Sequence, residues 1–160
     1  MNGKLHLSLG TFVGIAGAIL IENDLNMAVP FAIGTMIGSL FPDIDQPSST
    51  ISKPIPIIPK LLNKVFGHRG FIHSPLFVFL LYILLSRYDS NIMIHKLVIG
   101  FTLGMIIHLV QDIFTKGGIP LFFPFTRQKI SFGFFKSGSK ADPIITFILG
   151  LIWIIVIWVI

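Results

Sequence analysis

Five apolar runs constrain the fold of this chain more than any other feature of its sequence. They are Leu7–Ile21, Met27–Phe41, Pro75–Ser86, Leu97–Phe114 and Ile144–Ile160. A helix that crosses a bilayer needs about 20 apolar residues, and several of these runs are shorter, which limits how far they can tilt. The composition, with 53% hydrophobic and 12% charged residues, is too apolar for a soluble domain. We therefore predict an all-α, polytopic transmembrane helical bundle of about five spans.

The length of the chain predicts a single domain. Four or five spans would use most of the 160 residues, so residues 1–160 form one membrane-embedded unit. The first run holds His6 at its start and is followed by the acidic turn Glu22–Asp24, without a small-x-small cleavage site before it. We predict a retained span there, not a signal peptide. The absence of cysteine excludes disulfides and thiolate metal ligands.

Glycine spacing predicts how the first two spans pack. Gly10 and Gly14, and likewise Gly34 and Gly38, have the small-xxx-small spacing that allows helices to approach closely. We expect a tight hairpin, although the same faces can pack between copies, so the oligomeric state stays open.

Two connections are too polar or too short to span. The stretch Pro42–His73 is rich in proline, but Ile57–Phe66 within it has the pattern of a short amphipathic helix on the membrane surface. The apolar segment Ile119–Phe125 is expected to lie at the interface.

The distribution of basic residues predicts the orientation. With a cytoplasmic N-terminus, ten of the twelve Lys and Arg residues fall inside and only Arg87 and Lys96 fall outside. The positive-inside rule therefore favours a multi-pass membrane protein with its N-terminus in the cytoplasm. The basic residues form no dense patch or nucleic-acid motif, so we expect membrane lipids as partners and no nucleic acid.

Polar residues that are unusual next to apolar spans gather on this cytoplasmic side. They are His6, Asp43, Asp45, His68, Arg69, His73, His108 and Asp112. Polar side chains at membrane depth tend to be functional. His95 falls on the outer side and is excluded, whereas Asp142 is explained by helix capping and remains a minor candidate.

His108 and Asp112 are the most informative pair. Four residues apart in a helix, they share one face and can bind one metal ion, with Thr115 one turn further along. The alternative is a His–Asp hydrogen bond that joins two helices.

Asp43 and Asp45 follow the second run directly. In an extended backbone both carboxylates would point to one side and would repel unless a cation lay between them. A turn or helix cap is the alternative interpretation.

The segment Gly67–Ser74 is the richest short stretch. His68 and His73 can bind a metal ion, and Arg69 offers a planar fork suited to a phosphate or carboxylate. Ser74 is better explained as the N-cap of the third run, with Pro75 at its first position, than as a nucleophile.

Seven residues are candidate metal ligands: His6, Asp43, Asp45, His68, His73, His108 and Asp112. This number exceeds the needs of one tetrahedral zinc and suits one or two divalent ions. Zinc, manganese and iron all accept such nitrogen and oxygen ligands.

The same motifs resemble a known family. Pro42–Asp45, His68–Ser74 and His108–Gly118 are similar to the PDxD, HRxxTHS and HxxxDxxTxxG elements of the YdjM-type (LexA-regulated) family of bacterial and archaeal inner-membrane proteins. The resemblance implies a metal-dependent hydrolase and places the family's N-terminal histidine at His6. Ile72 stands where threonine is usual, which removes a hydroxyl without touching a predicted ligand.

We expect hydrolysis of a phosphoester or related bond in a lipid or other membrane-associated substrate. Arg69 would hold the anionic group, and Asp45 or Asp112 would act as general base. The alternative is a metal-ion or proton-coupled transporter, but the polar residues lie at one face and no polar path crosses the membrane. A non-catalytic adaptor with a structural metal site is the third possibility.

Overall fold

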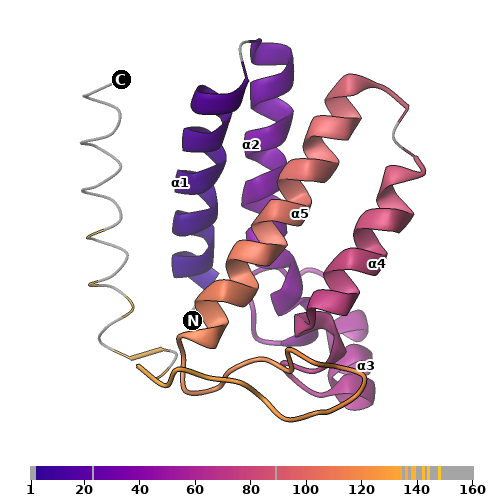
Figure 1. The fold of residues 1–160 in the computed structure, drawn as a ribbon. Coiled ribbons are helices and arrows are strands. Elements are labelled where there is room, and N and C mark those ends of the chain that lie inside the picture. The colour runs from indigo at the N-terminus through magenta and orange to yellow at the C-terminus, as the bar shows by residue number, and fades with distance from the viewer. Residues whose placement is uncertain are drawn as a thin grey trace.

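In the part of the chain that this computed structural model describes, four upright helices stand above one short helix (Figure 1). The structure describes residues 3–22, 24–88, 90–134, 136, 138, 139, 142, 144 and 148. The elements are α1 (Gly3–Ile21), α2 (Leu25–Leu40), α3 (Ile57–Phe66), α4 (Pro75–Ser86) and α5 (Ile92–Ile113), with the 3₁₀ turns η1 (Phe41–Asp45) and η2 (Phe71–His73). Among these described residues there is no β-strand, only an antiparallel bridge between Ile119 and Ile130. The prediction of an all-α bundle is confirmed.

Within the described ranges, three segments are long and apolar enough to cross a membrane: Gly3–Ile21, Leu25–Asp45 and Ile92–Ile113. The helix α4 has 12 residues and rises only about 18 Å, which is less than the thickness of the hydrocarbon core. The predicted fifth span, Ile144–Ile160, lies outside the described residues except for Ile144 and Ile148.

The helix α5 begins five residues earlier than the apolar run predicted. The side chain of Asn91 accepts a hydrogen bond from the backbone N–H of Ile94, so it caps the helix at Ile92. Lys96, inside this added turn, pairs with Glu22 at 2.6 Å. The capping residue and the ion pair thus extend the helix through residues that are too polar for the hydropathy pattern to include.

Glycines bring α1, α2 and α5 into close contact. A Cβ atom on Gly10 or Gly14 would meet Ser39 or Thr35 of α2, so the predicted α1–α2 hairpin is confirmed. Gly34 and Gly38 have a different partner, because Cβ atoms there would meet the backbone of α5. Two glycines of α5 face α2 in return, namely Gly100 and Gly104. The helix α2 is therefore packed between two neighbours at backbone distance.

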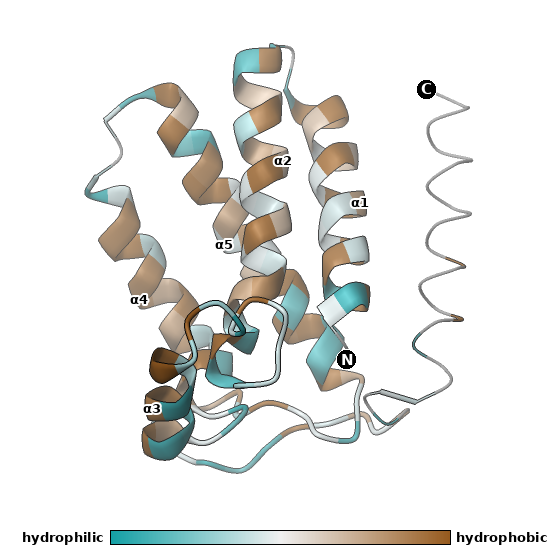
Figure 2. Ribbon diagram, turned by 180° about the vertical axis from the view of Figure 1, so that it is seen from behind, coloured by the Kyte–Doolittle hydropathy of each residue, from teal (hydrophilic) through white to brown (hydrophobic). Residues whose placement is uncertain are grey.

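The lower end of the bundle in Figure 1, which we call the base, collects the polar parts of the chain. The start of α1, the end of α2, the start of α4 and the end of α5 all lie there, and the loop after α5 crosses beneath them. Figure 2 shows apolar helices above and hydrophilic residues gathered at the base.

The predicted amphipathic helix is confirmed as α3, with the same bounds. It is held to η1 by Asn63, whose side chain donates a hydrogen bond to the backbone carbonyl of Asp45 at 2.9 Å. Ile57, Leu61 and Val65 remain exposed on it. This is the arrangement expected of a helix that lies at a membrane interface.

Candidate metal centre

Five of the seven predicted ligands meet at the base of the bundle. His6 comes from α1, Asp43 from η1, His73 from η2, and His108 and Asp112 from the last turns of α5. All five are buried. Residues more than 100 positions apart in the sequence are therefore brought together by the packing of α1 and α5 against α2.

Two of the three buried imidazoles, those of His6 and His108, are oriented by a hydrogen bond at Nδ1. His6 Nδ1 lies 2.6 Å from the Gln111 side-chain oxygen, and His108 Nδ1 lies 2.7 Å from the Ser39 carbonyl. Both partners can only accept, so in each ring Nδ1 carries the proton. His73 Nδ1 faces Asp45 Oδ2 at 3.1 Å. His6 and His108 therefore turn Nε2, with its lone pair, toward the centre of the cluster, as metal-binding histidines do, and His73 Nε2 points to the same place.

The Nε2 atoms converge with two carboxylates. His73 Nε2 and His108 Nε2 are 3.3 Å apart, and each lies 3.6 Å from Asp112 Oδ2. Asp43 Oδ1 is 3.8 Å from His108 Nε2. His6 Nε2 is buried without a hydrogen bond to the described residues and lies 3.5 Å from Asp112 Oδ1. Lone pairs this close repel unless a cation or a proton lies between them.

Two overlapping triplets in this cluster have the geometry to bind a metal ion. One is His6, Asp43 and His108, and the other is His73, His108 and Asp112. Within each triplet the potential ligand atoms lie within 4.8 Å of one another. His108 belongs to both, so the donor set fits one or two divalent ions and contains only nitrogen and oxygen ligands.

The two carboxylates of the Asp43–Asp45 motif point to different places, in contrast to the expectation for an extended backbone. Pro42 starts the 3₁₀ turn η1, which continues from α2 and separates the two side chains. Asp43 faces the cluster, whereas Asp45 Oδ1 lies 2.9 Å from His68 Nδ1 and Asp45 Oδ2 accepts from the backbone N–H of Arg69 at 3.0 Å. Asp45 thus holds the segment that carries His68 and His73.

Arg69 lies deep in the site. Its backbone has φ of 57°, a left-handed conformation that is uncommon outside glycine and that often marks functional sites. Its guanidinium donates to Asp112 Oδ1 at 2.6 Å and to Thr115 Oγ1 at 2.8 Å. The bond to Oδ1 fixes the Asp112 carboxylate, whose Oδ2 lies 3.6 Å from Nε2 of both His73 and His108.

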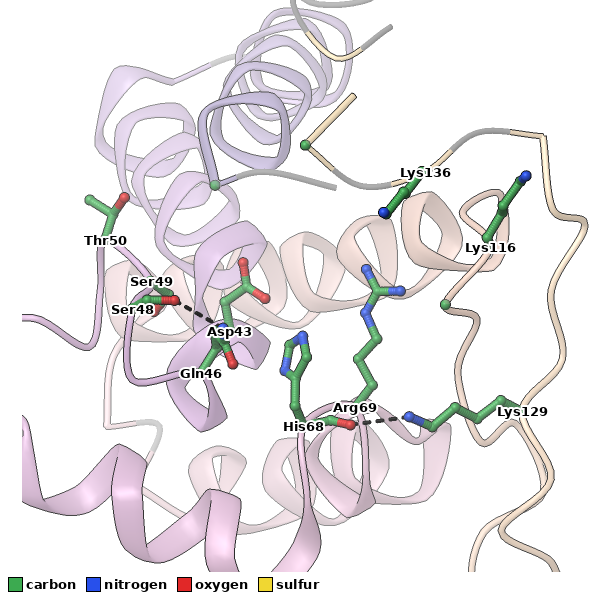
Figure 3. A pocket seen from close by; sticks show the side chains of 13 residues that line it. Asp43, Gln46, Ser48, Ser49, Thr50, His68, Arg69, Lys116, Lys129 and Lys136 are labelled. Atoms are coloured by element: carbon green, nitrogen blue, oxygen red, sulfur yellow. Dashed lines mark hydrogen bonds between the residues drawn. The ribbon is translucent and has the colours of Figure 1, made fainter. Parts of the chain in front are cut away.

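A pocket of about 750 Å³ opens beside the cluster (Figure 3). Asp43, His68 and Arg69 lie between its two walls, with Ser48, Ser49 and Thr50 on one side and three lysines on the other. Those lysines are Lys116, Lys129 and Lys136. Asp43 therefore belongs to both the buried cluster and the accessible pocket.

Burial alters two ionisable groups outside the spanning segments. It lowers the pKa of His73, which favours the neutral, metal-binding form of the imidazole. It also lowers the pKa of Lys129, and the positive charge of Arg69 acts in the same direction.

Several site residues were not identified from the sequence. Gln111 and the Ser39 carbonyl, which orient His6 and His108, gave only weak signals: a glutamine in an apolar helix and a serine near a helix end. Lys129 and Lys136 support the predicted orientation of the chain, but no motif marks them as site residues. The expected cap is confirmed, because Ser74 Oγ accepts from the backbone N–H of Phe77 at 3.2 Å.

The fold and site together define an α-helical membrane protein with a buried histidine–aspartate cluster at one end of its bundle. The sequence profile described as "YdjM inner membrane protein" matches residues 1–160. This chain belongs to that family.

The chain is also similar to two curated proteins. The chain is 35% identical over 147 residues to "Uncharacterized protein YvsG" of Bacillus subtilis, covering 91% of this chain and 87% of the relative. It is 36% identical over 108 residues to "Inner membrane protein YdjM" of Escherichia coli, covering 66% of this chain and 54% of that protein. No solved structure matches the chain.

Proposed function

We propose that this protein is a membrane-bound, metal-dependent hydrolase that cleaves a phosphoester or related bond in a lipid or other membrane-associated substrate. One observation carries the proposal: the Nε2 atoms of His6, His73 and His108 converge on Asp43 and Asp112 beside an open pocket. A metal ion bound there would lower the pKa of a water molecule and supply hydroxide near neutral pH. Zinc, manganese and iron all suit the donors.

We place the base of the bundle on the cytoplasmic side of a multi-pass protein. The support is the distribution of charge, since ten of the twelve Lys and Arg residues belong to the segments assigned to that side. The exposed apolar face of α3 would lie in the same interface. A lipid headgroup could then enter the pocket while its chains stay in the bilayer.

Some residues of the site hold the metal ligands in place, and another is positioned to transfer a proton. Arg69 holds Asp112 and Thr115 through its guanidinium, and the Asp45 carboxylate faces His73 Nδ1 at 3.1 Å. His68 lines the pocket, its side chain is 38% exposed, and its Nδ1 is hydrogen-bonded to Asp45. An imidazole oriented by a carboxylate can deliver a proton to a leaving oxygen, so we assign His68 this role in place of a metal ligand.

Metal removal tests the proposal. Detergent-purified protein loaded with zinc, manganese or iron is expected to release phosphate from phosphatidate or a polyprenyl phosphate, and chelation is expected to abolish the release. The measurement is phosphate release together with metal content. Folded, metal-loaded protein that hydrolyses none of a panel of phosphoesters would contradict the proposal.

His68→Gln is expected to slow the reaction about 10²-fold or more while the metal content stays unchanged.

Asp45→Asn tests whether the carboxylate behind His73 supports metal binding. The amide keeps the shape but loses the charge that orients the imidazole, so we expect metal affinity to fall about 10- to 100-fold. The measurement is competition with a chromophoric chelator. Asp24→Asn is the matched control. Asp24 caps the start of α2, whereas Asp45 lies in η1 after the end of α2, and asparagine caps a helix as well as aspartate does. Equal affinities for both variants would refute the role of Asp45.

A further inference from the structure

The pocket beside the cluster is strongly basic. Among the described residues that line it are four cationic side chains, Arg69, Lys116, Lys129 and Lys136, and one carboxylate, Asp43. Three other lysines of the base, Lys53, Lys60 and Lys64, are not among the lining residues. A general excess of positive charge on one side of the membrane therefore does not account for the concentration of lysines in this cavity.

The arginine in this pocket is already engaged. The Arg69 guanidinium donates to Asp112 and Thr115, both buried, so its hydrogen bonds serve the site itself. With two of its five N–H donors used in this way, Arg69 is held in place by the site, so an anionic group in the pocket would also need other cationic donors.

Two lysines of the pocket can supply positive charge to such an anionic group. Figure 3 shows Lys129 and Lys136 reaching toward the region of His68 and Arg69, whereas Lys116 points away. The Lys129 ammonium donates to the His68 carbonyl at 3.1 Å, which fixes one of its three protons and holds the group at the pocket wall. Like charges gathered in one cavity favour an anion among them.

We propose that Lys129 and Lys136 form a binding site for the phosphate of a phosphomonoester, with the hydroxyls of Ser48 and Thr50 on the facing wall available to its polar head. The proposal deepens the hydrolase function and names the substrate class, so it rests on that function for its biological meaning. The binding itself depends only on the lysines. Ammonium groups bind phosphate as point charges, and a dianion would match two of them.

The test is phosphate binding by the full chain in detergent, measured calorimetrically with and without metal. Inorganic phosphate is one probe, and bicelles of phosphatidylcholine with and without phosphatidate are the other. Lys129→Gln combined with Lys136→Gln is expected to weaken binding about tenfold per lysine lost. The matched control is Lys60→Gln combined with Lys64→Gln on α3, which removes the same charge from the same end of the molecule. We expect it to change binding less than about twofold, because exposed, distant charges are screened.

Each outcome decides the proposal. Loss of phosphate binding in the pocket variant alone supports it, and a preference for phosphatidate over inorganic phosphate identifies the source as a lipid headgroup. No binding of either probe by the wild type, or equal weakening in both double variants, overturns it. Lysine-dependent binding by metal-free protein would stand even if no hydrolysis were found. Hydrolysis that is unaffected by the lysine substitutions would refute only the lysine site.

Discussion

Replacing His108 by alanine is expected to abolish stoichiometric metal binding. His108 is the one residue shared by both potential ligand triplets, and its Nε2 lies within 4 Å of His73, Asp43 and Asp112. Removing it takes a ligand from either one or two bound ions. We expect the affinity to fall at least about a hundredfold, because each ligand supplies several kcal/mol of a structural-site binding energy. The measurement is elemental analysis of purified protein, followed by titration with zinc, manganese and iron.

The matched control is His95→Ala on the same helix. His95 lies roughly 20 Å from His108 along α5, at the end of the helix that is far from the base. Its removal is expected to leave the metal content unchanged. Wild-type protein that binds no metal after reconstitution, or equal loss in the two variants, would refute the metal centre. The cluster would then be a hydrogen-bonded contact between helices, as the alternative interpretation of His108 and Asp112 proposed.

Helical periodicity was the most informative local signal for the site. His108 and Asp112 are four residues apart in a helix, and the structure places His108 Nε2 3.6 Å from Asp112 Oδ2. This pairing follows from the geometry of one element and needs no tertiary information. The bounds of α3 and the cap at Ser74 were predictable for the same reason.

The backbone of the Asp43–Asp45 motif was not predictable in this way. An aspartate pair fits an extended strand, a turn or a 3₁₀ helix, and the direction of each side chain depends on which one forms. Here η1 continues the preceding helix, so Asp43 reaches the buried cluster and Asp45 reaches His68 and Arg69. Only the packing of α3 and η2 against η1 shows which partner each carboxylate takes.

The supporting residues were harder still to infer. Gln111 orients His6, which is 105 residues away in the sequence, and Lys129 reaches the carbonyl of His68 from the loop after α5. Neither residue type has a characteristic spacing for these roles. Such contacts arise from long-range packing, so hydropathy and motif patterns cannot locate them.

Gly104→Ala is expected to damage both the packing of the bundle and the metal centre. A Cβ at this position would meet the carbonyl of Thr35 and the backbone nitrogen of Ser39, and neither helix backbone can give way locally. Overpacking of this kind costs about 1–3 kcal/mol, against about 1 kcal/mol gained from the better helix propensity of alanine. We expect a lower thermal midpoint in detergent.

The same substitution links helix packing to metal binding. His108 lies one turn after Gly104, and its Nδ1 is held by the carbonyl of Ser39, the residue whose backbone nitrogen the new methyl group would meet. Separation of α2 and α5 would lengthen this bond and free the imidazole to turn, so metal affinity should fall along with stability. Gly17→Ala is the control, because its Cβ would meet only the ring edge of Phe31, a side chain that can shift. If both variants bind metal as tightly as the wild type, the close approach of α2 and α5 does not position His108.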